Sequence, residues 1–277
     1  MKIFSHLVCV IALFLCACVS AGPKKDLPLS FLTVDGIHAG DNGVIYVAAG
    51  FDGSKVYEIA ADGRVSEIAD GLAGPVDIAK TSDGMLYVTN FFTKTLSRID
   101  ADGVISDFGE LLEGPSGIAS DSQDNLYISH FGAAGEGDTI IKVTPNGESS
   151  VFASGGFLQG PVGIAVDEYD NVYVANLGNG IITKIDKYGD QHKITQIQSE
   201  NGFSIGHLAY FDGRIYATNL ADGRIFVIRR DGKMRKLRAS KRVKLPNGIT
   251  YNPVTGNIMV AEVFKPIATL VNIKVKR

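Results

Sequence analysis

Side chains able to bind a cation or transfer a proton recur at two kinds of position in this 277-residue chain. The first kind ends a short apolar stretch such as VYVAN, and its members are Asn90, His130, Asn176, Asn219 and Glu262. The second kind begins a stretch such as PNGI, and its members are Asp35, Asp77, Ser116, His207 and Asn247. Carboxylates and amides suit hard cations, and histidine transfers protons near neutral pH.

Two interpretations of these residues are open. In the first they form a polar ring, with Asp35, Asn247 and Glu262 holding calcium or another divalent cation. His130 or His207 would then serve as a base in ester or lactone hydrolysis. The remaining members would bind a ligand: Asp77, Asn90, Ser116, Asn176 and Asn219. In the second interpretation the asparagines only hydrogen-bond nearby loop backbone, and each histidine is structural.

The elements that must position these residues are visible as an internal repeat. GPVDIAKTSDGMLYVTN from Gly74, GPSGIASDSQDNLYISH from Gly114 and GPVGIAVDEYDNVYVAN from Gly160 are copies of one pattern, and three degenerate copies begin at Val34, Ile205 and Pro246. The central position recurs every 40 to 46 residues or so, the spacing of propeller blades.

Each copy predicts two short strands joined by a turn such as Asp83 with Gly84, and a further hairpin such as VYEIAADGRVSEIA follows. Each repeat therefore supplies four antiparallel strands. The last repeat lacks its fourth strand, whereas an extended piece, LPLSFL, precedes the first. We expect an all-β, six-bladed β-propeller over residues 22–277, closed by residues 27–32 completing the last blade.

The motifs PNGITYNPVTGNIMVAE and GPxGIAxDxxDNxYVAN resemble those of NHL-repeat and SMP-30/gluconolactonase-like propellers, over essentially all of residues 22–277. That group includes calcium- or zinc-dependent lactonases, lyases, synthases and domains that only bind. The resemblance implies a metal at the mouth of the central channel. It implies Asn247 and, more loosely, Asp35 as the counterparts of the metal ligands. The matching positions elsewhere hold Val76, Ser116, Val162 and Gly206, so the glutamate of the lactonases is missing.

Apolar residues directly follow the polar strand ends. They are Phe51, Phe91 with Phe92, Phe131, Leu177, Leu220 and Val263 with Phe264. They fit either an apolar collar around a small-molecule site or packing between adjacent blades.

The first 21 residues have the layout of a secretory signal: a lysine, an apolar run from Val8 to Val19, then small residues. Cleavage after Ala21 fits, and so does a bacterial lipoprotein signal with Cys18 as the lipidated residue. We therefore expect an exported protein, periplasmic or secreted, or anchored to a membrane through Cys18. All three cysteines lie in this segment, which leaves the propeller without disulfides.

The stretch from Arg229 to Lys244 holds nine basic residues and one acid, whereas the whole chain has a net charge of −3. It fits either a solvated rim or contact with an anionic surface. No motif for nucleic-acid recognition accompanies it, and we expect a monomer.

Common catalytic signatures are absent, including HExxH, GxSxG and SxxK. We therefore favour an exported propeller that binds a small molecule, glycan or peptide at the channel mouth. A divalent-metal-dependent, lactonase-type hydrolase is the alternative.

Overall fold

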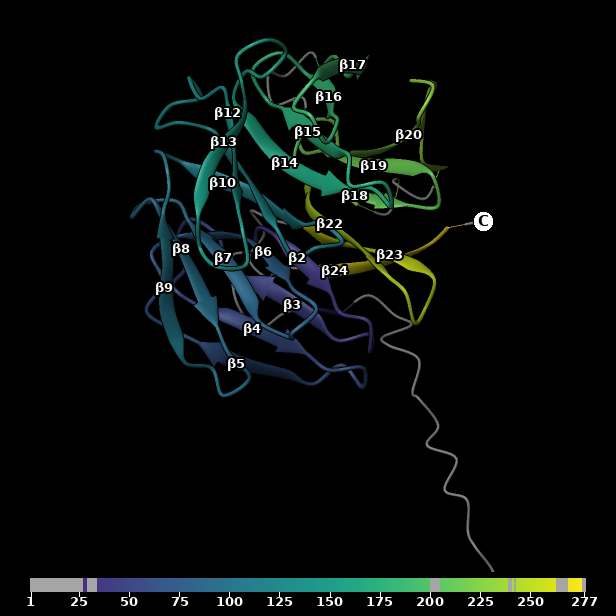
Figure 1. Ribbon diagram of the computed structural model, residues 1–277. Coiled ribbons are helices and arrows are strands. Elements are labelled where there is room, and N and C mark those ends of the chain that lie inside the picture. Colours follow the sequence, from purple (N-terminus) through teal and green to yellow (C-terminus); the bar gives the residue numbers. More distant parts are fainter. Residues whose placement is uncertain are drawn as a thin grey trace, which may run out of the picture.

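The computed structural model describes residues 27–28, 34–199, 205–238, 241, 243–262 and 269–275. These residues form six four-stranded antiparallel sheets arranged as the blades of a propeller. In Figure 1 the first strands of the blades lie toward the middle of the disc, and the fourth strands β5 (Val65–Ala69), β9 (Ile105–Glu110) and β17 (Gln191–Gln196) lie toward its rim. The predicted all-β, six-bladed architecture is confirmed.

The first three blades follow the chain order. Blade 1 contains β2 (Ile37–Ala39), β3 (Ile45–Ala48), β4 (Val56–Ile59) and β5 (Val65–Ala69). Blade 2 contains β6 (Pro75–Lys80), β7 (Leu86–Asn90), β8 (Thr95–Ile99) and β9 (Ile105–Glu110). Blade 3 contains β10 (Pro115–Ser120), β11 (Leu126–His130), β12 (Thr139–Val143) and β13 (Ser149–Ser154).

The last three blades repeat the pattern. Blade 4 contains β14 (Pro161–Val166), β15 (Val172–Asn176), β16 (Ile181–Ile185) and β17 (Gln191–Gln196). Blade 5 contains β18 (Leu208–Phe211), β19 (Arg214–Asn219), β20 (Arg224–Arg229) and β21 (Met234–Lys236). Blade 6 contains β22 (Pro246–Asn252), β23 (Asn257–Glu262), β24 (Thr269–Lys274) and β1 (Leu27–Pro28).

The turns between the first two strands have the backbone that their sequences predict. Gly84 has a φ of 91°, and the equivalent aspartates Asp124, Asp170 and Asp212 have φ values of 61°, 61° and 49°. Glycine adopts this left-handed region without steric cost, and aspartate tolerates it better than most residues. These residues thereby allow each innermost strand to reverse directly into its neighbour.

The hydrophobic core consists of six clusters between facing blades. In one cluster Tyr173 and Ile182 of blade 4 pack with Leu208 and Ile215 of blade 5. The cluster between the last and first blades closes the ring, because Met259, Ala261 and Leu270 pack with Ile45 and Val47. Burial of apolar side chains on both faces of every blade thus holds the disc together without disulfides.

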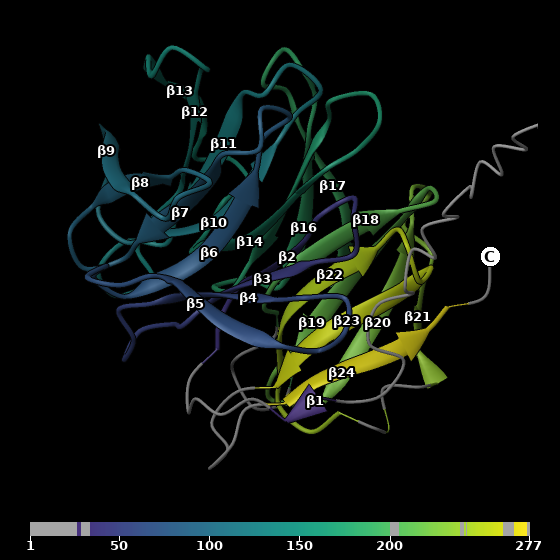
Figure 2. The same ribbon diagram turned by 90° about the horizontal axis from the view of Figure 1, so that it is seen from below.

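The N-terminal strand pairs with the last blade over a short length. Leu27 pairs with Leu270 and Pro28 with Thr269, and Figure 2 shows β1 beside β24. Residues 29–32 lie outside the described residues, so closure of the ring by the whole segment 27–32 stays a prediction. The expected signal, with Cys18, also lies outside them. In the described ranges no helix is long and apolar enough to cross a membrane.

Candidate functional site

A β-bulge near the start of the innermost strand aims side chains at one mouth of the central channel. The register shifts between Pro115 and Ile118 in blade 3, and equivalent shifts occur in blades 2, 4 and 6. An extra residue in one strand bends it and re-aims the local side chain. Ser116, Val162 and Asn247 lie in these bulges, and all three line the same cavity.

Hydroxyl groups on the second strands fix the bulges of the following blades. Thr89 Oγ1 donates to the carbonyl of Ser116 at 2.6 Å, and Thr218 Oγ1 donates to the carbonyl of Asn247 at 2.7 Å. Ser129 bonds the carbonyl of Val162 in the same way, at 2.5 Å. All three donors are fully buried. Our sequence reasoning missed them, although a hydroxyl recurs one position before the strand end in VTN, ISH and ATN.

Two glycines of the repeat create room for charged neighbours. A Cβ on Gly36 would lie 2.0 Å from Asp77 Oδ1, and a Cβ on Gly163 would lie 2.5 Å from the Cα of His207. Real Cβ atoms do not approach so closely, and neither glycine has a positive φ. The glycines are therefore needed for close approach of adjacent innermost strands, which lets Asp77 and His207 occupy the axis.

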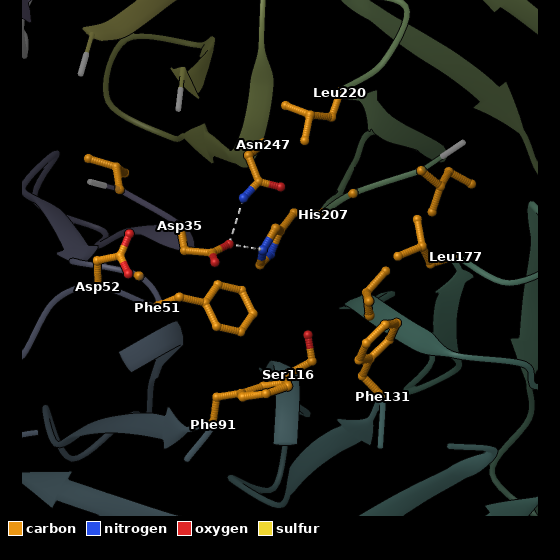
Figure 3. Close-up of a pocket in the computed structure, with 15 residues that line it drawn as sticks. Asp35, Phe51, Asp52, Phe91, Ser116, Phe131, Leu177, His207, Leu220 and Asn247 are labelled. Carbon is orange, nitrogen blue, oxygen red and sulfur yellow. Dashed lines mark hydrogen bonds and ion pairs between the residues drawn. The ribbon is translucent and has the colours of Figure 1, made fainter. Parts of the chain in front are cut away.

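His207 lies between the carboxylates of Asp35 and Asp77, and Figure 3 shows it beside Asp35 and Asn247. Its Nε2 is 2.9 Å from Asp35 Oδ1, and its Nδ1 is 3.5 Å from Asp77 Oδ2. Asn247 Nδ2 donates to the same Asp35 Oδ1 at 2.7 Å. Asp77 also accepts hydrogen bonds from the backbone N–H groups of Ile78 and Ile118. Blades 1, 2, 3, 5 and 6 are thereby connected through one buried polar cluster.

The cluster keeps His207 protonated. Burial by itself would lower the pKa of His207, but the negative charge of Asp77 and the hydrogen bond to Asp35 outweigh it and raise the pKa to about 10. Burial raises the pKa of Asp35, with His207 opposing this effect. We take the imidazolium as the state at neutral pH, because His207 faces two carboxylates and one of them suffices to balance its charge. An imidazolium with both nitrogens facing carboxylates cannot accept a further proton, so His207 is poorly suited to be a general base.

His207 also separates two cavities. The mouth cavity, of about 440 Å³, is lined by Asp35, Ser116, His207 and Asn247 among others. A second cavity, of about 320 Å³, opens toward the other face and is lined by Asp77 and His207 together with residues of the innermost strands. The Asp35–His207–Asp77 cluster thus divides the channel.

The walls of the mouth cavity are apolar. The lining residues that follow the second strands are Phe51, Phe91, Phe131, Leu177 and Leu220. Phe51 and Phe91 meet edge to face, with ring centroids 4.7 Å apart. Of the two interpretations, the lining favours the apolar collar for these five positions. Phe92 is 62% exposed and does not line the cavity, and Val263 and Phe264 lie outside the described residues. Asp52 at the rim is a lining residue that our sequence reasoning missed.

The asparagines at the ends of the second strands, Asn90, Asn176 and Asn219, do not line the mouth cavity. Asn90 Nδ2 donates to Ser97 Oγ at 2.8 Å, and Asn176 Nδ2 donates to Thr183 Oγ1 at 3.1 Å, each within its own blade. Asn219 Oδ1 accepts from the backbone of Asp222. Of the two interpretations, these contacts favour the one without a polar ring for the three asparagines, because their side chains turn toward the third strand and the adjoining loop.

His130 is also absent from the cavity lining. It is 1% exposed, and within the described residues neither of its ring nitrogens has a hydrogen-bond partner. Burial lowers its pKa to about 4, and nearby backbone groups of Leu112 and Glu113 oppose this effect only weakly. His130 is therefore neutral at physiological pH. The structure does not place it beside His207 or any carboxylate of the mouth cavity.

The expected cation ligands do not come together. Asp35 and Asn247 meet, but Oδ1 of Asp35 is occupied by two nitrogen neighbours. Glu262 Oε1 accepts from the backbone N–H of Lys244 at 2.6 Å, and Glu262 does not line the cavity. No group of three or more His, Cys, Asp or Glu side chains in the described part of the chain is arranged to hold a metal ion. These residues do not fit the calcium site that the sequence suggested.

The basic stretch lies on the outer side of blade 5 and the connection to blade 6. Arg230 pairs with Glu168, and Arg229 and Lys233 pair with Asp231. The exposed strand β21 carries Arg235 and Lys236. None of the described residues of this stretch lines the mouth cavity.

Comparison with known proteins agrees with the fold. The model of the virginiamycin B lyase family matches residues 26–270. The chain belongs to the virginiamycin B lyase family. This membership is consistent with the NHL- and SMP-30-like resemblance of the motifs. No curated protein matches the chain significantly.

Solved structures of the virginiamycin B lyase family share the architecture at low sequence identity. A virginiamycin B lyase from Staphylococcus aureus is 16% identical with a TM-score of 0.64, and the match covers 90% of this chain and 98% of that one. A catalytically inactive histidine-to-alanine form of that enzyme with quinupristin matches with 16% identity and a TM-score of 0.66, over 91% of this chain and 89% of that one.

A solved structure of a differently named enzyme has the same kind of fold. The PQQ-bound aldose sugar dehydrogenase from Streptomyces coelicolor is 16% identical with a TM-score of 0.70, over 91% of this chain and all of that one. Similarity at this level shows the fold alone.

Proposed function

We propose that this protein binds a small organic molecule in the mouth cavity of its central channel. The observation that supports the proposal is a cavity of about 440 Å³ with apolar walls and a few polar groups at its floor. Ligand sites in proteins commonly combine such a volume with mostly apolar walls and a small number of convergent polar groups. Phe51, Phe91 and Phe131 would cover the apolar body of the ligand.

The polar floor would orient the ligand. Asp35, Ser116 and Asn247 lie at the base of the cavity, where a polar group of the ligand can reach them (Figure 3). The Asp35–Asn247 hydrogen bond of 2.7 Å and the hydroxyl contacts of Thr89 and Thr218 hold these residues in place before a ligand arrives. A preformed site loses less conformational freedom on binding, which favours affinity.

The absence of tryptophan from the sequence offers a direct test. Phe91→Trp would place a single fluorophore in the cavity wall, and Phe108→Trp would place one in outer strand β9, where Phe108 packs against Tyr87. We expect small apolar and amphipathic compounds to change the emission of the first variant in a saturable way and to leave the second unchanged.

A blocking variant completes the test. Leu220→Trp adds bulk inside the cavity, whereas Leu112→Trp adds the same bulk at a position that is 47% exposed and outside the cavity lining. Calorimetry should show loss of binding only for Leu220→Trp. Equal binding by both variants would mean that the cavity is not the binding site.

Elimination is a second candidate function, supported by membership of the virginiamycin B lyase family. Within the described residues no hydrogen bond occupies Asp35 Oδ2, and the raised pKa of Asp35 makes its carboxylate a stronger base than usual. Asp35 would accept a proton from a ligand carbon, a C=C bond would form, and the neighbouring C–O bond would break with its electron pair leaving on a carboxylate.

The product of a lactone distinguishes this candidate from the hydrolase alternative. Elimination converts a lactone into an isomer of unchanged mass, whereas hydrolysis adds the mass of one water. Mass spectrometry of lactones after incubation with the protein therefore separates the two reactions. Turnover that survives Asp35→Asn would exclude Asp35 as the base.

We also propose that the protein is exported, which the signal-like first 21 residues support. Fractionation of expressing cells should place the protein outside the cytoplasm. If Cys18 is lipidated, Cys18→Ala should release the protein from the membrane fraction.

A further inference from the structure

We propose that the molecule bound in the mouth cavity carries a positively charged amino group. This inference rests on the proposed binding function and adds the charge of the ligand. It is supported by the hydrogen-bonding groups, the charges and the aromatic walls of the cavity.

Most of the free hydrogen-bonding capacity of the floor is on the acceptor side. Asn247 Nδ2 already donates to Asp35, and both ring nitrogens of His207 face carboxylates. Within the described residues no hydrogen bond uses Asp35 Oδ2 or Asn247 Oδ1, and both residues line the cavity. Ser116 points its hydroxyl group toward the same space (Figure 3). Only the Ser116 hydroxyl can also donate, so a ligand group that supplies several hydrogen-bond donors suits this floor best.

The charged groups of the site also favour a positively charged ligand, because the carboxylates outnumber the cations. An imidazolium between Asp35 and Asp77 leaves one negative charge uncompensated when both carboxylates are ionised. Asp52 at the rim adds a second, and among the described residues that line the cavity there is neither lysine nor arginine. Burial strengthens the attraction of such a site for a cation, because the interaction is poorly screened.

The aromatic walls favour a cation as well. Phe91 lies with its ring centroid 4.7 Å from that of Phe51 and 6.5 Å from that of Phe131. The faces of aromatic rings carry negative electrostatic potential and attract ammonium groups. Rings and carboxylates together make a site for an organic ammonium group attached to an apolar body.

A metal ion fits this cavity poorly. Calcium takes six to eight oxygen ligands, whereas the floor offers oxygens from Asp35, Asn247 and Ser116 within apolar walls. A charged amino group needs about three acceptors, which is what the floor presents.

Three probes of nearly equal shape test the proposal: phenethylammonium, phenethyl alcohol and hydrocinnamate. Calorimetry of the unmodified protein at neutral pH should show that phenethylammonium binds at least about tenfold more tightly than the alcohol, with hydrocinnamate the weakest. The advantage of the ammonium should shrink as salt is added.

Replacing single carboxylates tests which of them attracts the ammonium group. Asp35→Asn should weaken phenethylammonium binding about tenfold or more and leave the alcohol unaffected. Because Asp35 also binds His207, Asp52→Asn provides a variant outside that cluster, with an expected loss of about threefold. Asp41→Asn is the matched control, since Asp41 lines the cavity on the other face.

The outcomes separate this inference from the proposed function. If the alcohol or hydrocinnamate binds as tightly as the ammonium, or if the ammonium preference survives both Asp35→Asn and Asp52→Asn, the inference is wrong and the binding function stands. If none of the three probes binds, the inference is wrong and the proposed binding function also loses support.

Discussion

Replacement of His207 by alanine is the perturbation that most directly probes the polar cluster at the channel centre. His207 is 7% exposed and lies 2.9 Å from Asp35 and 3.5 Å from Asp77. Its removal leaves two buried carboxylates without their shared cation. Loss of one partner of a buried ion pair typically costs about 3–5 kcal/mol of unfolding free energy.

The pKa shift of His207 gives a second value for the unfolding free energy that His207→Ala would lose. A rise from 6.5 to about 10 corresponds to an upper bound of roughly 5 kcal/mol, at about 1.4 kcal/mol per pKa unit. The raised pKa of Asp35 acts against this, because burial of its charge costs stability once that carboxyl ionises. We therefore expect His207→Ala to lower the unfolding free energy by about 3 kcal/mol at pH 7.

The sign of the pH dependence follows from the same shift. A histidine whose folded pKa exceeds its unfolded value contributes its full stabilisation below about pH 6.5 and loses it as the pH rises through about 10. The difference in stability between the natural protein and His207→Ala should therefore shrink between pH 7 and pH 10. Titration of groups that do not interact with His207 cancels in this difference.

Urea unfolding followed by circular dichroism at several pH values measures the effect. His192→Ala is the control, because the His192 side chain is 58% exposed and 3.9 Å from Asp186. A His207→Ala protein as stable as the natural one at pH 7, or a stability difference that stays constant up to pH 10, would refute the assignment of an imidazolium between two carboxylates.

Four further predictions concern the supports of the site and its surroundings. Gly36→Ala should destabilise the fold by about 1–3 kcal/mol in chemical denaturation, because its Cβ would lie 2.0 Å from Asp77 Oδ1; Gly109→Ala, with its nearest neighbour at 3.8 Å, should change stability by less than about 0.5 kcal/mol. Thr218→Val should cost about 1–2 kcal/mol and weaken ligand binding, because the Asn247 carbonyl loses a hydrogen bond of 2.7 Å; unchanged affinity would show that Thr218 does not position Asn247. Calcium or a chelator should leave the melting temperature unchanged, because Glu262 accepts from the Lys244 backbone and does not line the cavity of Asp35 and Asn247; a clear rise with calcium would restore the metal site. Charge reversal at Arg235, Lys236 and Arg238 should abolish salt-sensitive binding to vesicles that contain anionic lipid, as measured by co-sedimentation; retention of binding would leave the stretch as a solvated rim.

Much of the fold could be predicted from the sequence because each repeat carries its own local signals. Turns such as Asp83 with Gly84 fix where strands reverse, and the central apolar positions fix which residues are buried between blades. The apolar collar could be predicted for the same reason, since Phe51, Phe91 and Phe131 follow equivalent strands and repeat symmetry gives them equivalent positions around the axis.

What only the tertiary structure decided is the direction of the polar side chains and their partners. Side-chain direction reverses with every residue of a strand, so the bulge that shifts the register between Pro115 and Ile118 decides that Ser116 faces the axis. The same alternation turns Asn90 into its own blade, although it stands only one residue before Phe91. The pairing of Asp35 with His207 joins residues 172 positions apart, and only closure of the ring brings them together.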